Sequence, residues 1–384
     1  MAHHVVDLPL GGNPPGTARS VRLHRFGSAG ARPLVYVQGG LHATEIPGML
    51  AADRLVRRLM ALDAAGAVTG EVRVVPVANP LGLDQRVFDE RIGRFDMAGN
   101  GNFNRDHADL LDAVVARVDG RLGADASRNV ATIRAAALEA VATLSPLSQA
   151  DHLRRTLLSQ AVDADIVLDL HCDDIAPLHL YLGTPLWPGA ADLAADLGAE
   201  AVFVAEISGG HPFDEACSAL WWRLAAHFGP EVPILPACLA STVELRGMGD
   251  VEADLAARDA AGIIAFLQRR GAIAGTPPPL PELRCQATPL AGVDMVSSPV
   301  AGIVLPKVAV GDEVAAGACV AEVLAPSGPA AGGLEAPRPV ALCAATAGRV
   351  WSLTTRRFVD PGTVVVKVAG AAPLPGKTDL LLTP

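Results

Sequence analysis

The chain has 384 residues and a formal net charge of -10, and 50% of its residues are hydrophobic while 4% are aromatic. This length exceeds the usual size of a single hydrophobic core, which predicts one large domain and a small one. No cluster of Lys and Arg suited to phosphate binding occurs in the sequence. The acidic balance therefore argues against a nucleic-acid partner and favours a small-molecule substrate.

The N-terminus lacks the features of a secretion signal, because residues 1–5 contain neither a basic start nor a long apolar stretch. No later segment approaches the run of about eighteen apolar residues that a membrane span needs. We therefore expect a cytoplasmic protein with no membrane contact. The 6 cysteines are widely spread and form no CxxC pair, which indicates neither a thiolate zinc site nor a disulfide framework.

From residue 33 to about 267, short β-branched runs alternate with helical stretches, a pattern typical of an α/β sheet with helices on its faces. Short, Val-rich runs predict buried strands at 34–38, 72–77, 165–170, 201–205 and 239–244. Helices are expected at 46–60, 129–144, 148–162, 190–197, 216–228 and 250–269. The stretch 106–129 is harder to place, and we expect it to be a partly helical insertion.

The composition changes abruptly at 271–281, where closely spaced prolines predict a stiff extended linker. A domain boundary is expected there. The predicted organisation is a large domain at 1–270, a linker at 271–285 and a small domain at 286–384.

Beyond the linker the sequence repeats itself. Residues 298–304 resemble 345–350, and 311–314 resemble 360–364, which predicts an internal repeat of short strands and turns. This half-repeat resembles the biotinyl/lipoyl domains, small flattened barrels made of two pseudo-symmetric halves. Carrier members present a modified lysine on the hairpin between the halves, whereas 324–339 contains no lysine here. We expect an all-β barrel-sandwich domain that serves packing or a homo-oligomer.

Ligand-type side chains follow two of the expected strands. His42 and Glu45 come directly after the first strand, where a spacing of three brings both to one side of a helical turn. His171 ends the third strand, at the sheet edge where ligands of α/β proteins gather. Imidazole and carboxylate are zinc ligands, and a catalytic zinc has three protein ligands and one open position. The alternative is that each His is a hydrogen-bonded structural residue.

These residues belong to five motifs that together resemble the succinylglutamate desuccinylase/aspartoacylase family, relatives of the zinc carboxypeptidases. In family order the motifs are Gly39-Gly-Leu-His-Ala-Thr-Glu45, Asn79-Pro-Leu-Gly82, Asn102-Phe-Asn-Arg105, Asp169-Leu-His171 and Thr242-Val-Glu-Leu245. The resemblance implies a mixed central sheet with helices on both faces and one Zn²⁺ per chain. It implies that His42, Glu45 and His171 hold the zinc, that Glu244 is the general base, and that Asn104 and Arg105 bind the substrate carboxylate.

An arginine that stabilises the developing oxyanion is also needed. In the family it precedes an aromatic residue shortly before the Asn-Arg pair, and Arg94 before Phe95 fits that description. The stretch 96–101 lengthens the gap to the pair, so Arg86 and Arg91 are kept as substitutes.

Two further features border the expected site. Arg246 comes two residues after Glu244 and is expected to bind substrate; its alternative is a salt bridge with Glu244. The stretch 208–215 precedes an expected helix and is either a lid that contacts the acyl group or only a connection.

The sequence therefore predicts a zinc-dependent amidohydrolase that releases a carboxylate and an amine from a small N-acyl amino acid or related compound. Zinc lowers the pKa of bound water from about 15.7 to near 7, and Glu244 would transfer the water proton to the leaving amine. The alternatives are a carboxypeptidase-like peptidase acting on short peptides and a noncatalytic scaffold. The acyl group and the amine stay open, because variable loops form pocket walls.

Overall fold

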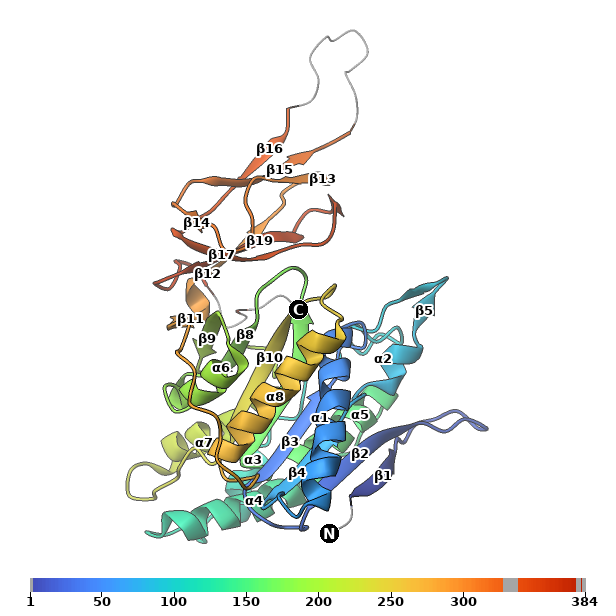
Figure 1. The fold of residues 1–384 in the computed structure, drawn as a ribbon, viewed down its shortest axis with the longest axis vertical. Helices are drawn as coiled ribbons and strands as arrows, with labels where there is room; N and C mark the ends of the chain where they lie inside the picture. The colour runs from blue at the N-terminus through green and yellow to red at the C-terminus, as the bar shows by residue number, and fades with distance from the viewer. Residues whose placement is uncertain (1–2, 327–337, 378–380, 382–384) are drawn as a thin grey trace.

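A large sheet with helices on both faces carries a small β domain at one end (Figure 1). The computed structural model describes residues 3–326, 338–377 and 381. Both the α/β class and the additional all-β domain expected from the sequence are confirmed.

The large sheet has 9 strands in the order β1-β2-β4-β3-β7-β10-β8-β9-β11. Their bounds are His4–Pro9 (β1), Ser20–Gly27 (β2), Leu34–Gly39 (β3), Glu71–Val75 (β4), Ile166–Asp173 (β7), His179–Gly183 (β8), Ala201–Ala205 (β9), Leu239–Gly247 (β10) and Ala287–Pro289 (β11). The central strands β4, β3, β7 and β10 are parallel, whereas β8 runs antiparallel to β10. Because parallel and antiparallel pairs both occur, the sheet is mixed. The strands expected from the sequence correspond to β3, β4, β7, β9 and β10.

Helices cover both faces of this sheet. Their bounds are Ile46–Ala64 (α1), Pro80–Asp84 (α2), Leu111–Val118 (α3), Ala126–Ala142 (α4), Gln149–Ala161 (α5), Ala191–Leu197 (α6), Phe213–Phe228 (α7) and Ala253–Arg269 (α8). One apolar core joins α1, α6 and α8 to the sheet, and a second joins α3, α4, α5 and α7 to its other face. Along β3, Leu34 and Tyr36 enter the second core while Val35 and Val37 enter the first, as strand alternation requires. The stretch 106–129, expected to be partly helical, contains α3 and the first turn of α4.

The small domain consists of two antiparallel sheets, in the orders β12-β19-β17-β14 and β16-β15-β13-β18. Its strands are Val293–Ser297 (β12), Gly302–Pro306 (β13), Glu313–Val314 (β14), Cys319–Leu324 (β15), Val340–Cys343 (β16), Gly348–Leu353 (β17), Phe358–Val359 (β18) and Val364–Gly370 (β19). Each sheet takes two strands from β12–β15 and two from β16–β19, which is the arrangement of an internal repeat. Most of the lysine-free hairpin at 324–339 lies outside the described residues.

The small domain contacts the large sheet next to the carboxyl ends of β7 and β10. Ile175 and Leu353 exchange two backbone hydrogen bonds, with N to O distances of 3.1 and 3.0 Å. Trp351 of β17 packs against Phe203 of β9, with ring centroids 4.5 Å apart. Strand β17 therefore rests directly against the large domain.

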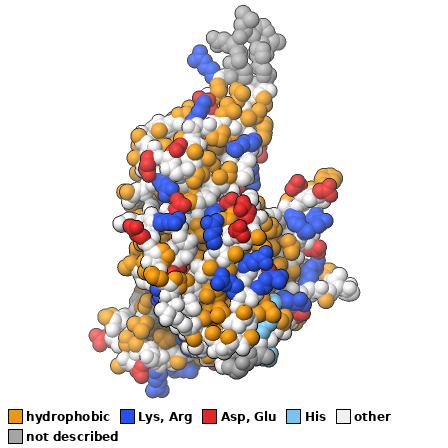
Figure 2. Space-filling view, viewed as in Figure 1, with side chains coloured by type: hydrophobic (Ala, Val, Ile, Leu, Met, Phe, Trp, Pro, Cys, Tyr) orange, Lys and Arg blue, Asp and Glu red, His pale blue; other side chains and the backbone are white. Residues whose placement is uncertain are grey.

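The surface in Figure 2 carries Lys and Arg side chains interspersed with Asp and Glu. Among the described residues, no helix combines the length and the apolar character needed to cross a membrane.

Candidate metal centre and substrate pocket

Helix α1 begins against the backbone of β7. A Cβ atom on Gly48, in the first turn of α1, would lie 2.3 Å from the carbonyl oxygen of Leu170, so only glycine permits this approach. Glu45 occupies the N-cap position of α1, yet its side chain makes no cap hydrogen bond. The carboxylate is directed instead toward His42 and His171.

His42, Glu45 and His171 form one buried cluster. Their candidate ligand atoms lie within 4.8 Å of one another. His42 Nδ1 is 2.9 Å from Glu45 Oε1, and His171 Nδ1 is 2.7 Å from Glu45 Oε2. The structure thus brings together the three residues that the sequence predicted as metal ligands.

The outer nitrogen of each imidazole faces an oxygen acceptor. His42 Nε2 lies 2.7 Å from Asn102 Oδ1. His171 Nε2 lies 2.9 Å from the fully buried carboxylate of Asp169, with which it can form an ion pair, and 3.3 Å from Asn104 Nδ2. An acceptor beside Nε2 favours the tautomer that carries its proton there and leaves the Nδ1 lone pair for a metal. Asn102 and Asp169 belong to the sequence motifs, which by themselves assign neither residue a role. The two-residue spacing of Asp169 and His171 on one strand was the signal that could have identified Asp169.

Burial and neighbouring charges set the protonation of this cluster. Burial, with the charge of Arg94, lowers the pKa of His42 to about 4. Burial opposes ionisation of Glu45, but the two histidines hold its pKa well below the usual value. Burial also opposes protonation of His171, but Asp169 and Glu45 raise its pKa well above the usual value. A metal would displace this last proton, because imidazole binds metals in its neutral form.

Glu244 lies beside the cluster on β10, where it pairs in register with His171. Burial, followed by the charge of Glu45, raises the pKa of Glu244 to about 8. Its Oε2 atom is buried and has no hydrogen-bond partner among the residues described. Glu244 also lines the pocket, so its carboxylate lies between the candidate metal ligands and the space for a substrate.

Arg246 is not brought to the pocket. The pairing of β10 with β7 is irregular between Glu244 and Gly247, and Arg246 has a left-handed φ of 66°. Its side chain turns toward α8 and donates to the two carboxylate oxygens of Asp259 over 3.0 and 2.5 Å. The alternative salt bridge between Arg246 and Glu244 is accordingly not formed.

Arg94 is brought to the cluster despite the longer gap before Asn104. The extra residues fold into a closed turn, in which Asp96 N donates to Gly101 O over 2.9 Å. Arg94 Nη1 consequently lies 3.1 Å from Glu45 Oε1 and 3.2 Å from His42 Nδ1. The substitutes Arg86 and Arg91 pair with each other in an exposed two-stranded hairpin, Arg86–Val87 (β5) and Glu90–Arg91 (β6), and do not line the pocket.

Asn104 and Arg105 enter the pocket from the loop that follows this turn. Asn104 Oδ1 accepts a hydrogen bond from Phe213 N at the start of α7, over 2.9 Å. Arg105 packs on Gly210, where a Cβ atom would lie 2.7 Å from Arg105 Cδ. Backbone hydrogen bonds from Asp106 and His107 fasten the same loop to residues 210–211. The stretch 208–215 thus helps to position Asn104 and Arg105, the residues predicted to bind the substrate.

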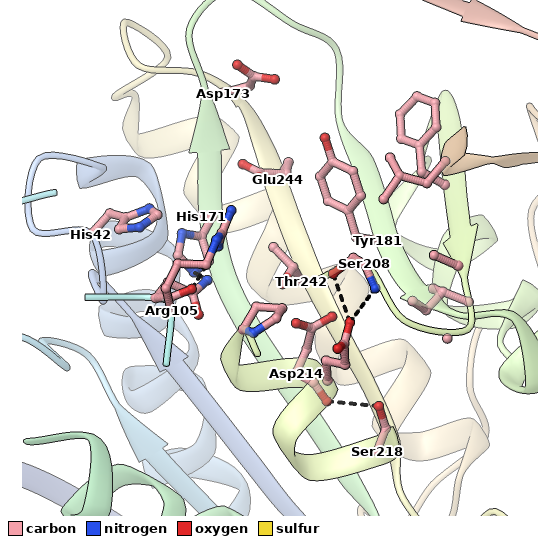
Figure 3. A pocket seen from close by; sticks show the side chains of 18 of the residues that line it. His42, Arg105, His171, Asp173, Tyr181, Ser208, Asp214, Ser218, Thr242 and Glu244 are labelled. Carbon is pink, nitrogen blue, oxygen red and sulfur yellow. Dashed lines mark hydrogen bonds between the residues drawn. The ribbon is translucent and has the colours of Figure 1, made fainter. Parts of the chain in front are cut away.

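The pocket extends from His42 and His171 toward the first turn of α7 (Figure 3). Its empty space, including the open mouth, is about 870 Å³. The walls include Ser208, Asp214 and Glu215, from the stretch 208–215 that the sequence placed beside the site. They also include four residues that the sequence did not indicate: Tyr181, Phe203, Trp222 and Lys367. The acidic first turn of α7 was a usable signal for Asp214 and Glu215. Nothing local could have indicated Lys367, since it comes from β19 of the small domain.

A mixed α/β sheet with a His-Glu-His cluster in a pocket at the carboxyl ends of its strands is typical of metallohydrolases. Residues 31–270 match the model of the succinylglutamate desuccinylase/aspartoacylase catalytic domain, and the chain belongs to that family. The resemblance found in the sequence is therefore confirmed, and the family identifies the chain as a hydrolase of acyl amides.

Solved structures of proteins named for this family have a similar fold over nearly the whole chain. A putative succinylglutamate desuccinylase/aspartoacylase from Shewanella frigidimarina is 26% identical with a TM-score of 0.79, covering 96% of this chain and 98% of its own. A family protein from Shewanella amazonensis is 27% identical with a TM-score of 0.78, covering 95% and 98%. The ectoine utilization protein EutE (DoeB) of Ruegeria pomeroyi, 19% identical with a TM-score of 0.67 and 96% of each chain covered, shares the fold. No protein with a curated description matches the sequence.

Proposed function

We propose that the protein is a zinc-dependent amidohydrolase that cleaves a small N-acyl amino acid or related N-acyl compound into a carboxylate and an amine. The observation that carries this proposal is the convergence of His42, Glu45 and His171 beside Glu244 in one pocket. A cytoplasmic location and a homo-oligomer stay predictions from the sequence.

The residues present fit zinc. Two imidazole nitrogens and one carboxylate are a usual donor set for catalytic zinc, with one position left for water. The acceptors beside both Nε2 atoms supply the outer contacts that orient ligating histidines. Zinc held here would lower the pKa of bound water to near 7, so that hydroxide is available at neutral pH.

The surrounding side chains suit the steps of amide hydrolysis. Glu244 would accept the proton of the attacking water on its carboxylate and return it to the leaving nitrogen. A divalent cation next to Glu244 would favour the ionised form that this role requires. Arg94 would place positive charge beside the carbonyl oxygen as charge develops there, and Asn104 with Arg105 would bind the substrate carboxylate.

A hydrolysis screen on the full chain tests the proposal. N-acetyl, N-succinyl and N-formyl amino acids are offered to the protein after chelation of metal and again after zinc is restored, with short unblocked peptides as a parallel series. We expect hydrolysis of an N-acyl amino acid that depends on zinc. Cleavage of peptides alone would favour the peptidase, and zinc-loaded protein that hydrolyses nothing in either series would refute amide hydrolysis.

A further inference from the structure

Two exposed cysteines of the small domain lie directly opposite each other. Cys319 begins β15 and Cys343 ends β16, and the two residues pair in register across these antiparallel strands. Both are free thiols, whereas Cys285 is only partly exposed and the other cysteines are buried. Their spacing along the chain did not indicate a pair, because the fold brings them together from the two halves of the internal repeat.

The backbone hydrogen bonds show which kind of strand pair the cysteines form. Ala344 N donates to Ala318 O over 2.9 Å, so the neighbouring pair on the ladder is hydrogen-bonded. The cysteine pair is therefore of the non-hydrogen-bonded kind, in which the Cα atoms are about 4.5 Å apart. A disulfide needs Cα atoms about 4.4–6.8 Å apart. The strands are thus already at a separation that a disulfide can bridge.

Both thiols face away from the core of the small domain. Val320, Leu342 and Ala344, the residues next to the cysteines along the two strands, are buried in that core. Because side chains alternate across a strand, Cys319 and Cys343 project together from the opposite face. Side chains directly opposite each other on one face are near neighbours, and they are closest in a non-hydrogen-bonded pair.

The pair is accessible and weakly held. Cys319 Sγ donates a hydrogen bond to Ala321 O over 3.3 Å, and a thiol is a weak donor. Figure 1 shows β15 and β16 on the part of the small domain that points away from the large sheet. A small reagent can therefore reach both sulfur atoms, and little opposes rotation of the Cys319 thiol toward Cys343.

A bond between these cysteines would fasten an edge strand. Strand β16 has 4 residues and lies at the end of its sheet, next to β15. Strand β15 belongs to the first half of the internal repeat and β16 to the second half. A disulfide here would therefore join the two halves of the small domain covalently.

We propose that Cys319 and Cys343 are a redox-active dithiol that a small disulfide such as glutathione disulfide converts reversibly into a cross-strand disulfide. The thiolate of one cysteine attacks glutathione disulfide, forms a mixed disulfide and releases one glutathione. The thiolate of the other cysteine then attacks the protein sulfur of that mixed disulfide and releases the second glutathione. Two protein thiols are oxidised, and their two protons end on the two glutathione molecules formed by reduction.

The setting of the pair makes this a reversible site. In the cytoplasm expected from the sequence, glutathione keeps most thiols reduced, and disulfides that do form there are usually redox-sensing. The pair is then a dithiol at low glutathione disulfide and closes as the glutathione pool becomes more oxidised. This chemistry is independent of amide hydrolysis, since neither cysteine lines the substrate pocket.

Thiol mapping on the full chain tests the proposal. The protein is equilibrated with glutathione disulfide and denatured, the remaining thiols are alkylated, and its peptides are analysed by mass spectrometry. We expect loss of two thiols per chain and one linked peptide that joins Cys319 to Cys343, with both thiols restored by dithiothreitol. A chain that keeps all its thiols, or that carries a separate glutathione on each of the two cysteines, would overturn the proposal.

Serine variants test whether each thiol resolves the mixed disulfide of the other. Cys343→Ser should retain one glutathione on Cys319, and Cys319→Ser should retain one on Cys343, because the second attack is lost. Cys285→Ser is the matched control and should form the same disulfide as the unmodified protein. Release of glutathione from both single variants as fast as from the unmodified protein would show that the two thiols do not act together.

Thermal unfolding measures the fastening of β16. The disulfide closes a loop of roughly 25 residues and so restricts the unfolded chain. The oxidised protein should unfold at a midpoint higher by roughly 3 °C or more than the reduced protein. Cys343→Ser should show no such difference between the two conditions. Equal midpoints for the oxidised and reduced forms of the unmodified protein would contradict a covalent link between the two halves.

Discussion

Lys367 Nζ donates a hydrogen bond to Asp173 Oδ2 over 2.6 Å, although the two residues are 194 positions apart in the chain. The same ammonium group lies 4.9 Å from the ring centroid of Trp351. Lys367 comes from the small domain, and Asp173 follows His171 by two residues on β7. The small domain is thereby fixed to the strand that carries a candidate metal ligand.

Removing this ammonium group should destabilise the protein. Lys367→Met leaves the largely buried Asp173 carboxylate without its cation, which should lower the free energy of unfolding by roughly 3 kcal/mol. Lys307→Met breaks a more exposed ion pair within the small domain, between Lys307 and Glu322. This variant should change the free energy of unfolding by less than about 1 kcal/mol. Urea titrations of both variants measure the difference. Equal losses would show that the pair to Asp173 is no stronger than a surface contact.

Metal content tests the ligand assignment. His42→Ala removes one of three proposed ligands, and the variant should retain well below one zinc per chain after dialysis. His227→Ala, at the exposed end of α7, should retain the zinc of the unmodified protein. Elemental analysis by mass spectrometry gives both values. Stoichiometric zinc in His42→Ala would make the assignment wrong.

The contact behind His171 should tune zinc affinity. Asp169→Asn keeps an oxygen near His171 Nε2 but removes the charge, and we expect zinc affinity to fall by roughly 10- to 100-fold. Asp165→Asn serves as the control. Asp165 directly precedes β7 and contacts Arg32 and Arg134, not the cluster of His42, Glu45 and His171. Competition with a chromophoric chelator compares the variants. Unchanged affinity in Asp169→Asn would remove Asp169 from the metal centre.

Glu244→Gln tests the proposed base. Without an ionisable carboxylate the variant should lose roughly 10²- to 10⁴-fold in kcat while it still binds zinc. Steady-state kinetics on the best substrate of the screen, paired with metal analysis, measures both. Normal turnover in this variant would exclude proton transfer by Glu244.

Asp214 should make stability depend on pH. Because the folded-state pKa, about 7, lies above the usual 3.8, the folded state holds its proton more tightly than the unfolded chain. Stability is therefore lost as pH rises from about 4 to 7, and the full loss remains above that range. Asp214→Asn should be more stable than the unmodified protein by roughly 2–4 kcal/mol at pH 8 and about equal at pH 4. A difference that is the same at both values would contradict the raised pKa.

The central strands of the large sheet could be predicted from the sequence. Strands β3, β7 and β10 are buried on both faces, so each appears in the sequence as a short run rich in Val and Leu. Strand β8 was not predicted, because its short segment mixes His179 and Tyr181 with leucine and glycine. The edge strands β1 and β2 alternate polar and apolar residues with many positions exposed, and were also not predicted.

The site was predictable where its residues are local. His42 and Glu45 share one turn, and strand alternation places Asp169 beside His171. The same alternation would put Arg246 on the face of Glu244, but the irregular pairing and the left-handed φ at Arg246 turn it away.

The contact between Asp173 and Lys367 also bears on how the protein is made. During translation, His42, Glu45 and His171 leave the ribosome long before β19 does. Domains fold largely in the order in which they are synthesised. The three candidate ligands are therefore synthesised, and can fold together, before the part of the pocket wall that Lys367 supplies. A chain that ends before β19 would contain all three candidate ligands but would lack this part of the pocket wall.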